Sequence, residues 1–181
     1  CYASELALGS KRRRNRDLLL SCLNRSTTTH LRGILKREAV EIMIKALRSL
    51  GINITEDWSQ NYLQVEACGG VSPVKHQNIK VGNAGTVARF LTAWLAVQED
   101  ASFIIDGSEE MRKRPIGPLV ESLNNFGCKI EGGDYLPLKI SPVDLNFEEN
   151  NIIEIDGSKS SQYVTGLLLA FSYLKSLHNI N

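Results

Sequence analysis

The sequence has few of the residues that would assign it to a specialised class of protein. Its 181 residues include only four cysteines, and no two of them have the C-x-x-C spacing of a redox or zinc motif. Four are too few for a disulfide scaffold, so we interpret them as reduced thiols of an intracellular protein. The three histidines have no ligand spacing with cysteines or carboxylates. No metal site is therefore expected.

Long apolar runs and an excess of one charge are also absent. No run approaches the roughly 20 apolar residues of a membrane-spanning helix. The formal net charge is +1, and basic and aromatic residues do not alternate, so neither a membrane nor a nucleic acid is expected as a partner. The G-x-S-x-G elbow and the Walker lysine loop are missing. With 43% hydrophobic and 23% charged residues, the chain has the composition of an ordinary globular domain.

What the sequence does contain is a turn of small residues before an apolar helix, in three versions. The clearest is Gly82-Asn83-Ala84-Gly85-Thr86, and the others begin at Gly9 and Gly157. These leading glycines lie 73 and then 75 residues apart, which indicates internal repeats. A helix N-terminus offers unpaired N–H groups, so each turn is a candidate site for a phosphate or carboxylate. A tight turn that only leads into a core helix would give the same pattern.

The hydrophobic spacing around these turns predicts alternating strands and helices. Helices with one apolar face are expected over 15–23, 37–50, 82–97 and 115–126, and after the Gly157 turn. Strands are expected at 6–8, 31–35, from 52, 63–67, 102–105, 128–130, 136–140 and 152–155. This order predicts an α/β fold of repeated βαββαβ units, of which the third is incomplete.

Cations and hydroxyls near the turns are candidates for binding an anion. Arg114 stands at the start of a predicted helix, where a cation opposes the helix dipole, and its guanidinium suits a carboxylate or phosphate. Lys11 follows Gly-Ser at another helix start. Arg112 and Lys113 are expected to be solvated surface charges. Two hydroxyls and an amide in the first turn of the last helix would cap it or bind a ligand: Ser160, Ser161 and Gln162.

Four ordered motifs resemble those of the 5-enolpyruvylshikimate-3-phosphate synthases, which join phosphoenolpyruvate to shikimate 3-phosphate. The matching segments are Gly9-Ser10-Lys11 with Asn15-Arg16, Gly82 to Thr86 with Arg89, Arg114 to Gly117, and Ser160 to Gln162. The resemblance implies the family's fold, an inverse α/β barrel of three repeated units in each of two domains. Residues 1–10 would be a crossover segment, and residues 11–181 a truncated substrate-binding domain. The C-terminal domain of the same polypeptide would be a missing partner.

The resemblance also implies a role for each matching residue. Lys11 would be catalytic and touch both substrates. Shikimate 3-phosphate would be bound by Lys11, Arg16, Thr86, Ser160, Ser161 and Gln162. Phosphoenolpyruvate would be bound by Lys11, Asn83, Gly85, Arg114 and Gln162. The reaction of this transferase, a step of the shikimate pathway to aromatic amino acids, needs proton transfer and charge stabilisation rather than a cofactor.

Several departures from the family pattern predict that the chain alone does not catalyse the reaction. Arg12 and Arg14 stand where the family usually has small residues, and Arg12 replaces a hydroxyl that binds shikimate 3-phosphate. An acidic pair of the family is reduced to Glu38-Ala39. The carboxylates of the other domain are absent. We interpret the chain, which begins at Cys1, as part of a longer cytoplasmic polypeptide, or of a plastid protein if an upstream transit peptide was lost.

Two other functions are alternatives to this one. The sister enzyme that transfers enolpyruvyl to UDP-N-acetylglucosamine has a Lys-Asn pair and a loop cysteine, whereas Lys11 is followed here by Arg12 and the loop around Arg112 to Arg114 has no cysteine. A degenerate, non-catalytic anion-binding remnant is favoured by Arg12, Arg14 and Ala39.

Overall fold

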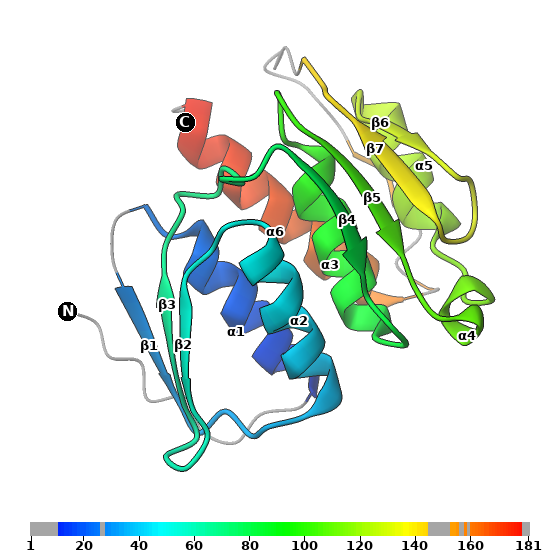
Figure 1. Cartoon of the computed structure of the whole chain (residues 1–181). Coiled ribbons are helices and arrows are strands. Elements are labelled where there is room, and N and C mark those ends of the chain that lie inside the picture. Colours follow the sequence, from blue (N-terminus) through cyan, green and yellow to red (C-terminus); the bar gives the residue numbers. More distant parts are fainter. Residues whose placement is uncertain (1–10, 26–27, 145–152, 156–157, 159, 179–181) are drawn as a thin grey trace. The chain divides into compact units, whose positions relative to one another are not determined.

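The computed structural model of the chain describes residues 11–25, 28–144, 153–155, 158 and 160–178 (Figure 1). The predicted strand at 6–8, residues Gly9 and Gly157, and the first residue of the strand at 152–155 lie outside this part. The chain divides into two compact units, Cys1–Val74 and Lys75–Asn181. In the described part of the chain, every helix is too short or too polar to traverse a membrane.

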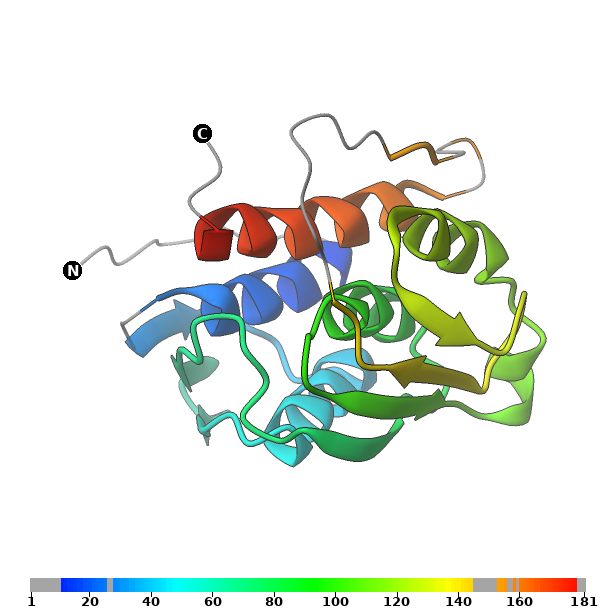
Figure 2. The same cartoon turned by 90° about the horizontal axis from the view of Figure 1, so that it is seen from above.

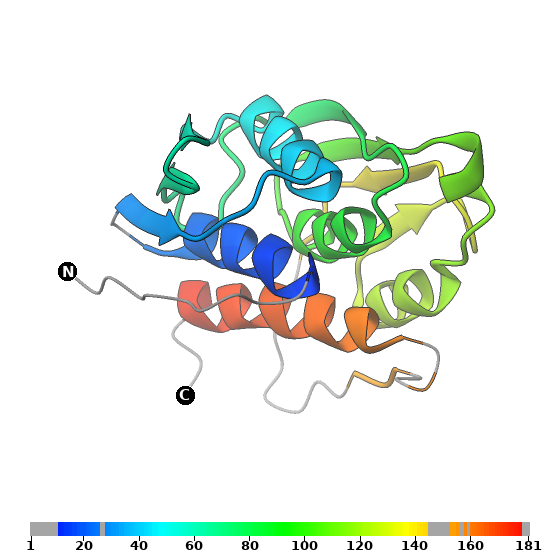
Figure 3. The same ribbon diagram turned by 90° about the horizontal axis from the view of Figure 1, so that it is seen from below.

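The first unit is a three-stranded antiparallel sheet with two helices on one side (Figures 1 and 3). Its strand order is β1-β3-β2. Leu63 and Val65 point to the same face of the central strand, and both are fully buried. This alternation is the one that the sequence predicts for 63–67. The elements are α1 (Lys11–Leu23), β1 (Thr28–Arg32), α2 (Glu38–Ser49), β2 (Ile54–Asp57) and β3 (Tyr62–Glu66).

Helix α2 confirms the predicted amphipathic helix and the glycine that ends it. Its buried stripe includes Met43 and Leu47, both 0% exposed. Gly51 follows the helix with a φ of +89°, a left-handed conformation that residues with a Cβ rarely adopt. A Cβ at Gly51 would also lie 2.9 Å from the Cβ of Pro73. Both the backbone angle and the available space therefore favour glycine at this position.

The second unit repeats this plan with one more strand. Its sheet has the order β4-β5-β7-β6, in which β4 is parallel to β5 and the other pairs are antiparallel. The order β5-β7-β6 matches β1-β3-β2, which agrees with the repeats predicted from the glycine spacing. The elements are β4 (His76–Lys80), α3 (Gly85–Ala96), β5 (Ser102–Asp106), α4 (Glu109–Arg112), α5 (Gly117–Phe126), β6 (Lys129–Glu131), β7 (Leu138–Ser141) and α6 (Ser161–His178).

Helix α3 is the centre of the second unit and lies between the sheet and α6 (Figure 2). All its residues except Thr86 and Arg89 are buried. Gly166 lets α6 come close, since a Cβ there would lie 3.3 Å from the Cβ of Ala93. The ring of Phe171 in α6 meets Phe126 of α5 edge to face at 4.6 Å between centroids. The two residues of α3 that escape burial are thus confined to its first turns.

Some predicted elements differ from the observed ones. Helix α5 begins at Gly117 with Pro118 in its first turn, so Pro115 precedes the helix. The segment 153–155 is not a strand, because the carbonyl of Glu154 accepts a hydrogen bond from the Ser122 hydroxyl (2.7 Å) rather than from a neighbouring strand. Strand β1 lies at 28–32 instead of 31–35, and β2 starts at Ile54. Strand β4 and helix α4 were not predicted.

Candidate anion-binding site

The turn between β4 and α3 is held against the end of β5. The N–H of Val81 donates to the carbonyl of Asp106 (2.8 Å), and the N–H of Ala84 donates to the carbonyl of Val81 (3.0 Å). Asn83 is exposed at the tip of the turn. Ala84 is the N-cap residue of α3 and supplies no side-chain acceptor. The Ala84 side chain therefore leaves the first N–H groups of α3 uncapped. Uncapped N–H groups at a helix N-terminus stabilise an anion that binds in front of the helix.

Arg114 reaches this turn from the connection between β5 and α5. Its Nη1 lies 3.4 Å from the carbonyl oxygen of Asn83. A Cβ at Gly85 would lie 3.5 Å from the same Nη1 and 3.0 Å from Nη1 of Arg89. The absence of a side chain at Gly85 therefore lets two guanidinium groups lie close to the backbone at the start of α3. The structure brings together Asn83, Gly85 and Arg114, three of the residues that the family resemblance assigns to phosphoenolpyruvate, and their binding role stays a prediction.

Arg89 connects three segments that are distant in the sequence. Its Nη1 donates to Oε1 of Gln162 at the start of α6 (2.7 Å), and its Nη2 lies 3.4 Å from the carbonyl of Pro115. Its guanidinium also lies over the ring of Tyr163, 5.3 Å from the centroid. The Tyr163 hydroxyl donates to the same carbonyl of Pro115 (2.8 Å). The turn before α3, the 107–116 connection and the first turn of α6 therefore form one cluster.

The remaining predicted residues of the second unit lie at the edge of this cluster. Thr86 is half-buried in the first turn of α3. Ser160 is half-buried, and its Oγ accepts a hydrogen bond from the N–H of Gln162 (3.2 Å), so it caps α6. Ser161 is exposed as the first residue of α6. The capping role and the ligand role that the sequence leaves open for these serines are compatible, because a hydroxyl can both donate and accept.

The other two predicted residues belong to helix α1 of the first unit. Lys11 is the first residue of α1, and its side chain lies outside the described part of the structure. Arg16 is half-buried, and its Nε lies 3.6 Å from Oδ1 of Asp17. Their roles as substrate contacts stay predictions.

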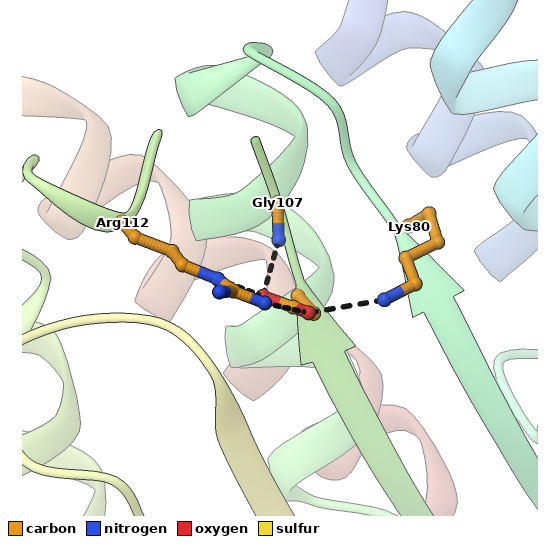
Figure 4. A network of polar contacts seen from close by, with 4 residues as sticks. Lys80, Gly107 and Arg112 are labelled. Atoms are coloured by element: carbon orange, nitrogen blue, oxygen red, sulfur yellow. Dashed lines mark hydrogen bonds and ion pairs between the residues drawn. The ribbon is translucent and has the colours of Figure 1, made fainter. Parts of the chain in front are cut away.

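A carboxylate at the end of β5 orders the charges beside the cluster (Figure 4). Asp106 Oδ1 accepts from Nε of Arg112 (2.9 Å) and from the N–H of Gly107 (2.8 Å). Its Oδ2 accepts from Nη2 of Arg112 (2.7 Å) and from Nζ of Lys80 (3.0 Å). Hydrogen bonds from Arg112, and then from Lys80 and Gly107, hold the pKa of Asp106 well below its usual range despite its burial.

This network corrects one expectation from the sequence. Arg112 is not merely a solvated charge, because it forms two hydrogen bonds with Asp106. Lys113 does lie at the surface, where it pairs with Glu110 at 2.8 Å. In the part of the chain that the structure describes, Arg114 pairs with no carboxylate and is exposed.

Sequence reasoning gave little weight to Arg89 and missed Asp106 and Lys80. Arg89 stands four residues after Gly85, so both occupy one face of α3, and this spacing was a usable signal. Asp106 directly follows the strand predicted at 102–105, but its two cationic partners lie six and 26 residues away. No local spacing identifies such partners. Among the described residues, no three His, Cys, Asp or Glu side chains are placed so that they could hold a metal ion.

Comparison with known proteins assigns the chain to a family. A family model described as EPSP synthase (3-phosphoshikimate 1-carboxyvinyltransferase) matches residues 4–178. The chain belongs to the EPSP synthase family. It is 41% identical over 165 residues to the 3-phosphoshikimate 1-carboxyvinyltransferase of Pseudomonas savastanoi pv. phaseolicola. The aligned region covers 90% of this chain and 38% of that protein. It is 38% identical over 171 residues to the chloroplastic enzyme of Brassica napus, covering 90% of this chain and 33% of that protein.

A solved structure of an EPSP synthase has the same fold. The enzyme from Acinetobacter baumannii superposes with a TM-score of 0.74 at 23% sequence identity, over 90% of this chain and 36% of that one. The family resemblance and the α/β fold expected from the sequence are thereby confirmed. The chain spans 38% of the Pseudomonas relative and 33% of the Brassica relative.

Proposed function

We propose that this chain supplies substrate-binding residues of an EPSP synthase. The enzyme would transfer the enolpyruvyl group of phosphoenolpyruvate to the 5-hydroxyl of shikimate 3-phosphate and release phosphate. One observation carries the proposal: in a chain of this family, two helix N-termini and the guanidinium groups of Arg89 and Arg114 gather around Gly85. Such an arrangement of N–H donors and cations suits a multiply charged anion.

Phosphoenolpyruvate would bind beside Gly85, whose lack of a side chain lets the guanidinium groups of Arg89 and Arg114 lie close to the backbone of α3. Arg114 would offer its guanidinium to the carboxylate or phosphate of this substrate, because it is exposed and not neutralised by a described carboxylate. Asn83 and the uncapped N–H groups of α3 would add donors. Gln162 would lie between the two substrates.

Shikimate 3-phosphate would bind toward the start of α6. The hydroxyls of Ser160 and Ser161 and the positive end of the α6 dipole suit its phosphate. Thr86 in the first turn of α3 would add another hydroxyl. As the family resemblance implies, Arg16 would hold the shikimate carboxylate, and Lys11 would touch both substrates.

The proposed chemistry is an addition followed by an elimination. The 5-hydroxyl adds to C2 of phosphoenolpyruvate while C3 takes up a proton, and the hydroxyl loses its own. Phosphate then leaves C2 as C3 gives up a proton, which restores the double bond. Lys11 would transfer a proton or stabilise charge in these steps. We propose that the chain needs the rest of its polypeptide for turnover, and that the enzyme works in the cytoplasm or in a plastid.

A non-catalytic anion-binding protein is the second candidate, and Arg12 favours it. A long cation at this position of α1 replaces the small residue that the family pattern has there. Arg14, half-buried in the same helix, and Ala39 in α2 are further departures. The sister reaction with UDP-N-acetylglucosamine lacks any supporting observation in the described site.

Titration of shikimate 3-phosphate into the folded chain by calorimetry tests the proposal. An Arg12→Ser variant and an inorganic phosphate titration serve as matched controls. Saturable binding by the parent chain that phosphate cannot reproduce supports a working substrate site that tolerates Arg12. Binding by Arg12→Ser alone identifies Arg12 as the group that blocks the site. Absence of binding by both folded proteins contradicts the proposal and favours the second candidate.

A further inference from the structure

Three consecutive cations, Arg112, Lys113 and Arg114, have different electrostatic partners. Asp106 neutralises Arg112 with two hydrogen bonds, and Glu110 pairs with Lys113. Arg114 extends to the carbonyl of Asn83 instead. Neighbouring guanidinium and ammonium groups repel one another and would all attract an anion. The carboxylates therefore decide which of the three charges is available to a ligand.

Asp106 also helps to fasten the connection that carries Arg114. Its carbonyl accepts from Val81, and its carboxylate accepts from Gly107, so the end of β5 is tied to the Gly82 turn and to the start of the connection. The N–H of Ser108 donates to the carbonyl of Gly82 (2.8 Å). A Cβ at Gly107 would lie 2.8 Å from that same carbonyl oxygen. The connection is thus fixed to the turn at close range.

Helix α4 transmits this attachment to Arg114. Ser108 caps the helix by accepting from the N–H of Met111 (3.1 Å), and Met111 is 0% exposed. The N–H of Arg114 then donates to the carbonyl of Met111 (3.0 Å). Because Arg112 belongs to the same short helix, its ion pair with Asp106 restrains the segment between these two anchors.

We propose that Asp106 is a positioning residue for the anion site. It holds Arg112 and the 107–114 connection against the end of β5, so that Arg114 is the cation presented to phosphoenolpyruvate. This inference rests on the proposed function. It adds a selectivity element: without the carboxylate, Arg112 and Lys80 become unneutralised cations near the site and bind small anions without regard to their shape. Asp106 itself touches neither substrate.

A double-mutant cycle tests the inference on the 181-residue chain, with phosphoenolpyruvate and inorganic phosphate as probes. The variants are Asp106→Asn, Arg112→Gln and the combination of both, and Lys113→Gln is the matched control. We expect Asp106→Asn to reduce the ratio of phosphoenolpyruvate affinity to phosphate affinity about tenfold, the size of one charged hydrogen bond. The combined variant should be no worse than Arg112→Gln, because the two residues act as a unit. Lys113→Gln should stay within about twofold, as exposed pairs contribute little.

Amide exchange of residues 108–114, measured without ligand, provides a readout that does not depend on substrate binding. We expect faster exchange at Met111 and Arg114 in Asp106→Asn and in Arg112→Gln. If Asp106→Asn does not fold, Asp106→Glu with Arg112→Gln takes its place. A purely structural role would lower stability, but it would leave the affinity ratio of the folded fraction unchanged.

Three results overturn the inference. The first is an unchanged affinity ratio in Asp106→Asn, and the second is losses of affinity that simply add in the combined variant. The third is unchanged amide exchange at Met111 and Arg114. If the parent chain binds no phosphoenolpyruvate, the proposed function fails, and the exchange experiment still decides whether Asp106 orders the connection.

Discussion

The two units share a strand order but differ in the connection that follows their corresponding strands. In the first unit, residues 33–37, all described, join β1 to α2 without a helix. In the second unit, residues 107–116 join β5 to α5, and they contain α4 and Arg114. Both sheets bury alternate residues of an inner strand, Leu63 and Val65 in β3 and Leu138 and Ile140 in β7. The candidate function lies in the longer connection, where changes do not disturb the core.

The corresponding helices α1 and α3 differ in burial as well. Helix α1 begins with a run of cations, and its Leu20 is 43% exposed. Helix α3 is covered by the sheet and by α6, and its Leu91 is 0% exposed. Helix α1 thus exposes part of its surface beside the fully buried Leu18 and Leu19, whereas almost all of α3 is buried.

The largest expected effect comes from the same substitution in these two helices. Leu91→Ala should lower the free energy of unfolding by about 2–5 kcal/mol, because it leaves a cavity between the sheet and α6. Leu20→Ala should cost less than about 1 kcal/mol, since part of the side chain already contacts water. Chemical denaturation monitored by circular dichroism measures both. Equal losses would show that α3 is not more tightly packed than α1.

A smaller effect is expected from alanine at one glycine of each unit. Gly107→Ala should cost about 1–3 kcal/mol, because the new Cβ meets a backbone carbonyl oxygen at 2.8 Å. Gly69→Ala has open space but a φ of +67°, and should cost about 1–2 kcal/mol through backbone strain alone. Only Gly107→Ala should also weaken phosphoenolpyruvate binding. Calorimetry on both variants checks this, and equal losses of affinity would contradict a local role of the connection.

The contribution of the longer connection to binding is tested at Arg114. Arg114→Gln keeps hydrogen-bonding capacity but removes the charge, and we expect phosphoenolpyruvate affinity to fall about tenfold. Lys113→Gln removes a neighbouring charge that already pairs with Glu110, and should change the affinity by less than about twofold. Titration at two salt concentrations separates the specific effect from general screening. Similar losses in both variants would mean that the anion responds only to the total charge.

The smallest expected effect concerns acid stability. The depressed pKa of Asp106 means that its ion pairs stabilise the folded chain above its unfolded pKa of about 3.9. This contribution is lost as the pH falls through the lower, folded-state value. Asp106→Asn should therefore be less stable than the parent at pH 7, on the order of 1 kcal/mol, and the difference should narrow below about pH 4. Thermal unfolding from pH 7 to pH 3 tests this; a constant difference would contradict it.

The sequence was sufficient to predict the elements whose apolar residues are periodic. Helix α2, helix α3 and strand β3 were predicted because they bury a regular stripe or an alternating set. Strand β4 was missed because it buries only Ile79 among polar residues at the edge of its sheet. Helix α4 has four residues, too few for a periodic signal. The sequence contains two prolines that could mark the start of α5, Pro115 and Pro118. The prediction used Pro115, but the helix begins at Gly117 with Pro118 in its first turn.

The candidate site was predictable where a motif is local and was not where it depends on tertiary contacts. Asn83 and Gly85 lie within one turn, and their proximity follows from the sequence. Their meeting with Arg114 was implied by the family resemblance rather than by spacing. The Asp106 network could not be predicted, because its residues come from three elements: the end of β5, the short helix α4 and the parallel strand β4. Their contacts form only in the folded chain.

The hydrogen bond between Arg89 and Gln162 has a consequence for synthesis on the ribosome. Its two residues are 73 positions apart, and Gln162 belongs to the helix that covers α3. While the chain is being made, the apolar residues of α3 leave the ribosome long before α6 does. A nascent chain that ends before α6 would expose α3 and would have no complete anion site, and it is at this length that chaperones would be needed most.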